Sequence, residues 1–457
     1  MIEMTLNQVL ALFGESNNES LDAGFRGVTI DSRKDCTGRL FVAIRGDHFD
    51  GHDYVTTAYR NGAVAALVET EIDCDIAQII VADCKQAMGV LANHWRHSCQ
   101  ATVIALTGSN GKTTVKDMLC QILLHDAPTH ATMGNFNNDI GLPLTLFDLS
   151  RDDRFAVVEL GANHAGEIAA LAKIADPEIV YVNNVAAAHL AGFGSVQGVI
   201  EAKGELYAYC KPQHRAVFNL DEAASQYWQS ICAAENKLSC ALNKNAEVNA
   251  SWSGEENGIS LEVNYAAQSQ RIRLKVFGEH NARNALAAIS IALITGLEFD
   301  RAVLNLTDFA GVKGRLQMMK GPQSSRLIDD SYNANPDSLE AGIKVLCSLP
   351  GEAWLALGDM KELGSETEAL HTLAAHAARQ EGVQKLFGVG EMSCIASDEF
   401  GEGGYCFEKV DEMADAILGQ IHQGVNLLVK GSRSAGMDKL VEYLLNNNNR
   451  EEINHAI

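Results

Sequence analysis

The chain has 457 residues, a length typical of about three domains. Its 36 Lys and Arg residues against 59 Asp and Glu residues give a formal net charge of −23, which excludes a nucleic-acid partner because phosphate backbones select basic surfaces. Apolar residues make up 47% of the chain, yet no apolar run approaches the roughly 18 residues that a membrane-spanning helix needs, so membrane insertion is excluded as well.

Residues 1–100 predict a small α/β domain. Two short strands, 28–30 and 40–44, each run into a polar cluster, Asp31-Ser32-Arg33 and residues 45–52. Arg and Ser side chains at two neighbouring strand ends can line one pocket and hold phosphate oxygens. Solvated loops at strand ends are the alternative, and the spacing alone leaves both interpretations open.

A glycine-rich stretch follows the next strand. The apolar run from Val103 to Leu106 is typical of a buried parallel strand, and it continues into Thr107-Gly108-Ser109-Asn110-Gly111-Lys112-Thr113-Thr114 and a helical pattern over 113–124. Glycines turn backbone N–H groups toward an anion, and the helix N-terminus adds partial positive charge. The stretch therefore predicts a phosphate-binding loop, in which Lys112 bridges phosphate oxygens and the Thr113 hydroxyl ligates Mg²⁺.

This loop departs from the usual pattern, which places four residues between its glycines. Here only Ser109 and Asn110 lie between Gly108 and Gly111. A tight strand-to-helix turn with an exposed lysine is the alternative.

Two polar segments come next. Asn135, Asn137 and Asn138 lie close together between glycines, as in an ordered polar loop, although Asn and Gly also simply favour turns. The predicted strand 155–160 carries Glu159 near its carboxyl end, where open parallel sheets gather ligands. A carboxylate there is suited to ligate a metal beside the phosphate-binding loop, or it caps the following helix.

The residues themselves give no role to two further side chains. His189 follows a predicted strand over 179–182, and a lone histidine is more often structural than a ligand. Lys203 lies in a predicted helix, where a lysine is usually exposed to solvent.

The middle region ends in a different pattern. Residues 271–276 alternate strictly, as in a half-buried antiparallel strand, and a helix is predicted from Gly278 to Ala292. Asn281 and Asn284 share one face of that helix and can present donor and acceptor to an adenine edge. Capping of the helix by Asn281 is the alternative.

The α/β pattern restarts beyond a predicted linker at 311–315. Four strands that each end in glycine or a polar residue and precede a helix predict a Rossmann-like domain: 326–330, 354–357, 386–389 and 427–429. No G-x-G-x-x-G follows a strand, so a separate dinucleotide site is not expected. Asn446 to Asn449 predict a polar tail.

The predicted fold class is therefore α/β with three domains. A small N-terminal α/β domain covers 1–100, a central P-loop ATP-binding domain with a mostly parallel sheet covers 101–313, and a C-terminal Rossmann-like domain covers 314–457. The N-terminus carries Glu3 and no basic cluster, so a signal peptide is not expected. Eleven scattered cysteines without a C-x-x-C pair predict reduced thiols and a cytoplasmic protein.

The stretch Thr107–Thr114 resembles the shortened phosphate loop of the Mur ligases. Other stretches in all three predicted domains are similar to one branch of that family: Gly134–Asn138, Glu159–His164, Asn183–His189, Asp330–Pro336, Gly358–Gly364 and Lys430–Arg433. The resemblance implies an ATP-dependent ligase that joins D-alanyl-D-alanine to UDP-N-acetylmuramoyl-tripeptide through an acyl phosphate, in the synthesis of peptidoglycan precursors.

The resemblance also implies roles for individual residues. Lys112, Glu159, His189 and Lys203 would be catalytic. Thr113 and Glu159 would hold one Mg²⁺, and His189 together with a carbamylated Lys203 would serve a second, which reverses the solvated role that the helix pattern gives Lys203. The ATP site would comprise Gly108, Ser109, Asn110, Gly111, Lys112, Thr113, Thr114, Asn281, Asn284, Arg315 and Asp330.

Three groups of residues would bind the other substrates. The UDP-substrate domain, residues 1–100, would contribute Asp31, Ser32, Arg33, Phe49, Asp50, Gly51 and His52. The asparagine loop would contribute Asn135, Asn137 and Asn138, and the third domain would bind the dipeptide with Tyr332, Asn333 and Asn335. One departure from the family pattern is Lys313, where proline is expected before Gly-Arg.

Three rival functions fit parts of this pattern. A Mur-type ligase for a different amino acid and a folylpolyglutamate-type ligase would lack the 330–336 run in this form. A non-catalytic UDP-nucleotide binder would not need Lys112, Thr113, Glu159, His189 and Lys203 together. We expect a monomer whose domains close about residues 311–315.

Overall fold

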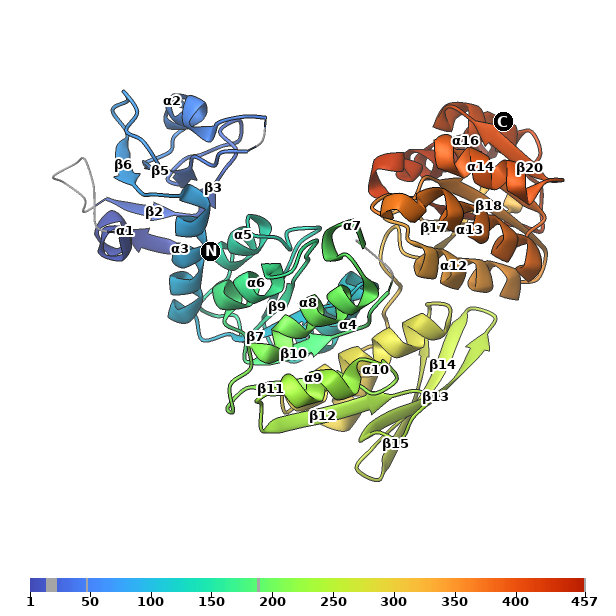
Figure 1. Cartoon of the computed structure of the whole chain (residues 1–457), viewed down its shortest axis with the longest axis horizontal. Helices are drawn as coiled ribbons and strands as arrows, with labels where there is room; N and C mark the ends of the chain where they lie inside the picture. Colours follow the sequence, from blue (N-terminus) through green and yellow to red (C-terminus); the bar gives the residue numbers. More distant parts are fainter. Residues whose placement is uncertain (14–22, 47, 187–189, 456–457) are drawn as a thin grey trace.

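The computed structural model describes residues 1–13, 23–46, 48–186 and 190–455. The chain forms three α/β domains that follow one another along its long axis, with the N-terminal domain at one end and the C-terminal domain at the other (Figure 1). This confirms the predicted fold class. None of the described helices combines the length and apolarity needed to cross a bilayer.

The N-terminal domain combines a two-stranded antiparallel ribbon with a parallel sheet in the order β3-β4-β5-β6. Its elements are β1 (Glu3–Thr5), α1 (Leu6–Phe13), β2 (Gly24–Arg26), β3 (Val28–Thr29), β4 (Leu40–Val42), α2 (Val55–Arg60), β5 (Ala65–Val68), β6 (Ala77–Ile80) and α3 (Cys84–Ser98).

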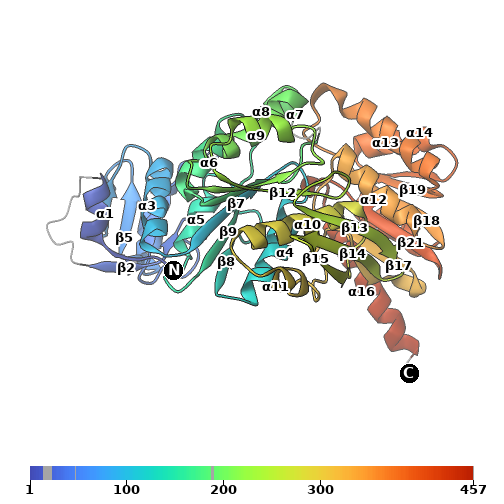
Figure 2. The same ribbon diagram turned by 90° about the horizontal axis from the view of Figure 1, so that it is seen from below.

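The helix α3 joins this domain to the next. Its N-terminus is capped by Asp83, whose side chain accepts the Gln86 N–H. Its apolar face, with Leu91 and Trp95, enters a hydrophobic core that also contains central-domain side chains such as Leu171. The first two domains are therefore packed as one body, which Figure 2 shows from below.

The central domain is built on a nine-stranded sheet in the order β15-β14-β13-β12-β11-β10-β7-β9-β8. Its elements are β7 (Thr102–Thr107), α4 (Lys112–Leu124), β8 (Thr129–Ala131), α5 (Gly141–Phe147), β9 (Phe155–Glu159), α6 (Glu167–Ala175), β10 (Ile179–Val182), α7 (Leu190–Phe193), α8 (Val196–Ala208), β11 (Arg215–Asn219), α9 (Ser225–Ile231), β12 (Asn236–Ala241), β13 (Val248–Glu255), β14 (Gly258–Tyr265), β15 (Gln268–Leu274), α10 (Glu279–Ile294) and α11 (Phe299–Leu304).

Helices on both faces explain why the strand β7 is apolar from Val103 to Leu106. Val103 and Ala105 enter the core shared with the N-terminal domain, while Ile104 and Leu106 pack with α4 and α10 on the other face. The predicted alternation near residue 271 is also confirmed. Ile272 of β15 is buried, and its neighbours in the strand are exposed, because β15 pairs antiparallel with β14 at the sheet edge.

The C-terminal domain has a six-stranded sheet, order β16-β17-β21-β18-β19-β20, parallel apart from β16. Its elements are β16 (Gln317–Lys320), β17 (Arg326–Asp330), α12 (Pro336–Ser348), β18 (Glu352–Gly358), α13 (Thr367–Glu381), β19 (Lys385–Val389), α14 (Glu391–Phe400), β20 (Gly404–Phe407), α15 (Val410–Leu418), β21 (Val425–Lys430) and α16 (Met437–His455). The predicted polar tail, residues 446–449, is helical and lies within α16.

One pair of cysteines differs from the expectation of reduced thiols. Cys394 of α14 and Cys406 of β20 form a disulfide with a Cα–Cα distance of 4.8 Å, and the other nine cysteines are free. The helix α14 packs against the edge strand β20, so two residues twelve apart in sequence become neighbours. The spacing of the cysteines in the sequence does not predict this disulfide.

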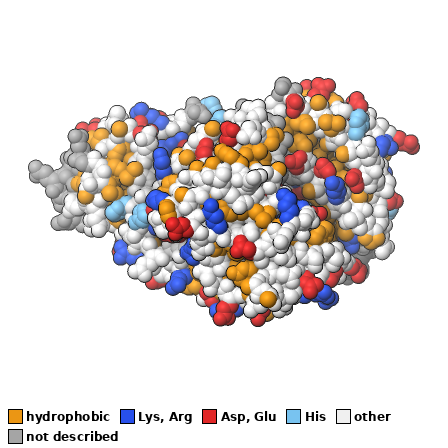
Figure 3. Space-filling model, turned by 60° about the horizontal axis from the view of Figure 1, so that its bottom comes forward, with side chains coloured by type: hydrophobic (Ala, Val, Ile, Leu, Met, Phe, Trp, Pro, Cys, Tyr) orange, Lys and Arg blue, Asp and Glu red, His pale blue; other side chains and the backbone are white. Residues whose placement is uncertain are grey.

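Charged side chains of both signs are mixed over the face of the molecule shown in Figure 3. On the face shown in Figure 3, acidic and basic side chains are interspersed and no basic patch gathers. This distribution agrees with the acidic composition, which disfavours nucleic acid as a partner.

Candidate active site

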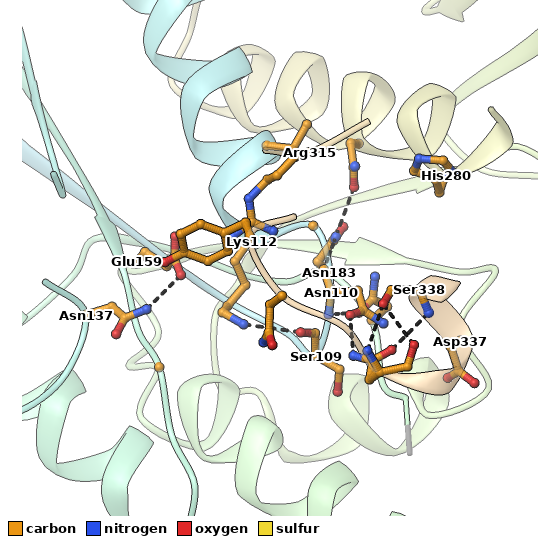
Figure 4. A pocket seen from close by; sticks show the side chains of 18 of the residues that line it. Ser109, Asn110, Lys112, Asn137, Glu159, Asn183, His280, Arg315, Asp337 and Ser338 are labelled. Atoms are coloured by element: carbon orange, nitrogen blue, oxygen red, sulfur yellow. Dashed lines mark hydrogen bonds between the residues drawn. The ribbon is translucent and has the colours of Figure 1, made fainter. Parts of the chain in front are cut away.

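A cleft of about 660 Å³ lies between the carboxyl edge of the central sheet and the C-terminal domain. Parallel strands place their carboxyl ends at one edge, so loops far apart in sequence meet there. The cleft is lined by the glycine-rich loop, the asparagine loop, the N-terminus of α10, the linker and the N-terminus of α12 (Figure 4).

The glycine-rich loop turns directly from β7 into α4. Gly111 has a φ of +75°, and a Cβ there would lie 2.6 Å from Asn284 Oδ1. Lys112 is half-buried, and its Nζ donates to the carbonyl oxygens of Gly108 at 2.8 Å and Ser109 at 3.3 Å. Burial lowers the pKa of Lys112. The turn is tight, as the alternative interpretation also has it, but its lysine is half-buried and not exposed.

Glu159 lies beside the loop and is 3% exposed. Its Oε2 accepts the Thr113 hydroxyl at 2.8 Å. Its Oε1 accepts the Asn137 Nδ2 at 2.8 Å, a bond marked in Figure 4. The carboxylate does not cap the following helix α6, because the N–H groups of Gly166 and Ala169 at the start of that helix are accepted by Glu205. The Thr113 hydroxyl and the Glu159 carboxylate offer the oxygen ligands that Mg²⁺ prefers.

Lys203 is 2% exposed, so its expected solvation is wrong. The inner face of α8 packs against β10 and α6, and the Lys203 Nζ lies 5.5 Å from the centre of the Phe193 ring. Burial, with the nearby Lys112 ammonium, lowers the pKa of Lys203 to about 7. A large fraction of this amine is therefore neutral near pH 7, as reaction with CO₂ requires.

The predicted adenine residues are buried at the start of α10. Asn284 Nδ2 donates to Asn281 Oδ1 at 3.2 Å, and Asn183 Nδ2 donates to Asn284 Oδ1 at 3.1 Å. Asn281 Nδ2 donates to the Phe277 carbonyl at 2.9 Å, and Gly278 is the N-cap. The N–H that Asn281 Oδ1 accepts comes from a side chain and not from the helix backbone, so the capping interpretation is wrong.

The linker and the third domain reach the loop. Arg315 Nη2 donates to the Thr113 hydroxyl at 3.0 Å, and its guanidinium lies 4.4 Å from the centre of the Tyr332 ring. Asp330 is buried, which raises its pKa, although Lys430 Nζ lies 2.5 Å from its Oδ2. Lys430 was missed from the sequence, and its position at the carboxyl end of β21 is the signal that could have identified it.

Most of the predicted site residues come together in this cleft. They are Ser109, Asn110, Gly111, Lys112, Thr114, Asn135, Asn137, Asn138, Glu159, Asn281, Asn284, Arg315, Asp330, Tyr332, Asn333 and Asn335. Asn183, Asn219, Asp337 and Ser338 also line it and were not predicted as site residues. His189 lies outside the described residues.

The predicted uridine-nucleotide residues lie outside this cleft, after strands β3 and β4. Arg33 is paired with Asp31, with Nε 2.8 Å from Oδ1, and this contact lowers the pKa of Asp31 to about 2. Asp50 accepts from Arg45 at 2.9 Å, and its Oδ1 lies 2.6 Å from His52 Nδ1. Each cluster is internally paired, and their common pocket stays a prediction.

The fold and the site define a class of three-domain α/β proteins with a phosphate-binding loop at the mouth of the central sheet. Three family models match the chain: the Mur ligase middle domain over residues 106–292, the Mur ligase, glutamate ligase domain over 314–433, and the Mur ligase family, catalytic domain over 24–96. The chain belongs to the Mur ligase family.

Individual relatives match over almost the whole chain. The UDP-N-acetylmuramoyl-tripeptide--D-alanyl-D-alanine ligase of Escherichia coli (strain K12) is 39% identical over 450 residues, which is 98% of this chain and 99% of that protein. The ligase of the same name from Bacillus subtilis (strain 168) is 30% identical over 91% of this chain and 94% of its own. A crystal structure of MurF from Acinetobacter baumannii superposes with a TM-score of 0.91 at 32% identity, covering 98% of this chain and 99% of that one.

The geometry at Gly111 gives a first prediction. In Gly111→Ala the new Cβ would overlap Asn284 and Asn183, so the loop must shift. We expect binding of ADP to weaken about tenfold, the scale of an overpacked site, measured by titration calorimetry. Gly382→Ala is the control, because Gly382 also has a positive φ but faces open space. Unchanged ADP affinity in Gly111→Ala would contradict the assignment of the loop.

Proposed function

We propose that this chain is an ATP-dependent ligase that joins D-alanyl-D-alanine to UDP-N-acetylmuramoyl-tripeptide, giving UDP-N-acetylmuramoyl-pentapeptide, ADP and phosphate. The observation that carries the proposal is the meeting of Lys112, the Thr113–Glu159 pair and Arg315 in one cleft. The identity of 39% with the E. coli ligase over 98% of the chain supports the substrate assignment.

A carboxylate oxygen is a poor leaving group, so the carboxylate must be activated before an amine can form an amide with it. An oxygen of the tripeptide carboxylate attacks the γ-phosphorus of ATP, the bond to ADP breaks, and an acyl phosphate forms. The amine of D-alanyl-D-alanine then attacks the acyl carbon, phosphate leaves and an amide forms, with one proton lost from the amine. Catalysis of such transfers is largely positioning and electrostatic stabilisation.

Lys112 and Arg315 supply that stabilisation. The Lys112 ammonium rests on loop carbonyls, and phosphate oxygens are stronger acceptors that can take their place. Arg315 contacts the same loop from the linker. It can therefore stabilise charge on the transferred phosphoryl group only when the third domain is packed against the central domain. Asn281 and Asn284 would contact the adenine.

Magnesium belongs to the proposal. Thr113 and Glu159 would hold one ion, whose charge would neutralise the phosphates. Among the described residues no cluster of three or more His, Cys, Asp or Glu side chains is suited to a metal, so a second ion needs other ligands. His189 and a carbamate on Lys203, whose added carboxylate supplies oxygens, are the proposed ones.

The remaining substrates are assigned to the outer domains. The dipeptide would bind at Tyr332, Asn333 and Asn335, where the third domain meets the loop. The muramoyl substrate would extend past Asn135, Asn137 and Asn138 toward the N-terminal domain, which would hold its uridine nucleotide at residues 31–33 and 49–52. We propose that the enzyme works as a monomer in the cytoplasm.

The direct test measures phosphate release from ATP with each substrate omitted in turn. We expect release to require both UDP-N-acetylmuramoyl-tripeptide and D-alanyl-D-alanine, with a product heavier than the tripeptide nucleotide by the dipeptide minus water. Equal turnover with a single amino acid such as D-glutamate in place of the dipeptide would overturn the substrate assignment.

Lys112→Ala tests the role of the loop cation. We expect a folded protein whose kcat is lower by about 10²–10³, the scale seen when one electrostatic stabiliser is removed. Lys361→Ala is the control, because Lys361 is an exposed lysine of the third domain. Near-normal ligation by Lys112→Ala would refute the role.

Lys203→Ala tests the carbamate. We expect activity to fall by about 10²-fold and to recover in part with formate or acetate, which can occupy the space and supply a carboxylate. Lys211→Ala, which removes an exposed lysine shortly after α8, should behave as the unmodified enzyme. Full activity of Lys203→Ala without added acid would remove the carbamate from the account.

A further inference from the structure

A chain of hydrogen-bonded asparagine side chains crosses the active-site cleft. It begins at Asn335, whose Nδ2 donates to Asn110 Oδ1 at 2.7 Å although 225 residues separate the two. It continues from the Asn110 carbonyl, which accepts Asn183 Nδ2 at 2.8 Å, and from there through Asn284 to Asn281. Dashed lines in Figure 4 mark part of this network around Asn110 and Asn183.

Asn110 is the point where the network enters the phosphate-binding loop. Its N–H donates to Asn184 Oδ1 at 2.8 Å and its carbonyl accepts from Asn183, so the central domain holds its backbone on both sides. Its side chain is therefore turned to the third domain. Because Ser109 and Gly111 form the same turn, a phosphate bound at this turn would lie next to Asn110.

Asn335 is the point where the network enters the third domain. It is the N-cap of α12, and its Oδ1 accepts the Ser338 N–H at 2.9 Å in a capping box. Its amide thus performs two separable tasks, since Oδ1 holds the helix and Nδ2 holds the loop. The cleft wall that follows, Asp337, Ser338 and Ala341, belongs to the first turns of the same helix.

The far end of the network is tied to the third domain as well. Asn281 donates to the carbonyl of Phe277, and the Phe277 side chain packs against the hydrophobic core around α12. A Cβ on the neighbouring Gly278 would lie 2.8 Å from Val345 of α12. The helix α12 is therefore connected to the nucleotide cleft at both its first and its third turn.

Asparagine suits this connection. One amide donates and accepts at once, and Asn183, Asn281 and Asn284 are at most 5% exposed, so their partners are protein groups. Buried amide networks of this kind rigidify when fully satisfied and are costly to break in part.

We propose that Asn110 and Asn335 are positioning residues that couple occupancy of the phosphate-binding loop to the placement of α12. The inference rests on the proposed function, in which α12 borders the site of the attacking amine. Nucleotide bound in the loop fixes the position of Asn110, and Asn110 fixes the N-terminus of α12 through Asn335. The cleft wall at the start of α12 is thereby aligned with the acyl phosphate.

The two tasks of Asn335 can be separated by substitution. Asn335→Ser keeps a good N-cap without adding charge, but the shorter side chain no longer reaches Asn110. Asn110→Ala removes the same hydrogen bond from the loop side and leaves the backbone contacts of residue 110 in place. We expect each variant to lower kcat about 3- to 10-fold, the range of one hydrogen bond. Asn335 also belongs to the proposed dipeptide site, so the expectation of an unchanged KM for the dipeptide applies to Asn110→Ala.

The double variant provides the decisive comparison. If the two residues act through their mutual hydrogen bond, Asn110→Ala with Asn335→Ser has the kcat of either single variant. If Asn335 acts only through the dipeptide site proposed for it and not through Asn110, the effects of the two substitutions on kcat multiply in the double variant. That second result would overturn the proposal.

Hydrogen exchange gives a readout that a merely structural role would not move. In the unmodified enzyme we expect adenylyl imidodiphosphate to slow exchange of the first amides of α12, and we expect this effect to vanish in both single variants while the nucleotide still binds. Asn264→Ser is the matched control, since it breaks an Asn264–Asn249 side-chain pair of 3.2 Å on the β13–β14 hairpin. Protection of α12 that persists in the variants would contradict the coupling.

Failure of the coupling proposal can be distinguished from failure of the proposed function. If the unmodified enzyme makes no pentapeptide nucleotide, the substrate assignment fails before any variant is compared. If it makes that product and the double variant shows multiplying effects, only the coupling fails.

Discussion

The site depends on one steric constraint, which is the turn from β7 into α4. The chain must leave a buried strand and enter a helix within a few residues, and the N-terminus of that helix is where an anion can bind. Gly111 satisfies this with a positive φ and no side chain, and the atoms of Asn183 and Asn284 fill the space that a Cβ would need. Lys112, Thr113 and Glu159 then take their places because the turn fixes where α4 begins.

The surroundings of the turn are neutral amides more than charges. A phosphate-binding site needs buried donors, yet every extra buried ion raises the desolvation cost. The asparagine side chains avoid that cost because they hydrogen-bond to one another. Three cations nearby each contact oxygen atoms: Lys112 contacts carbonyls, Arg315 a hydroxyl and Lys430 the Asp330 carboxylate. The same amides join the central domain to the third domain, so binding and domain placement share one set of contacts.

Local pattern predicted the loop and strands such as β10, because burial on both faces makes such a strand apolar throughout. It did not predict other strands, such as β11, β12 and β16. It failed where tertiary packing decides. Lys203 sits on an ordinary helical pattern, and only the packing of α8 against β10 and α6 buries it. The Cys394–Cys406 pair and the contact of Asn335 with Asn110 join residues whose proximity no spacing encodes. For Lys203, the resemblance to a family predicted a role in the active site, whereas the helical pattern alone predicted a solvated side chain.

The central claim is that the loop at residues 108–113 grips the triphosphate of ATP next to Glu159. A crystal structure with adenylyl imidodiphosphate tests it most directly. The account predicts β- and γ-phosphate oxygens within hydrogen-bond distance of Lys112 Nζ, which has left the carbonyls of Gly108 and Ser109. Nucleotide density elsewhere, with Lys112 still on those carbonyls, would contradict it.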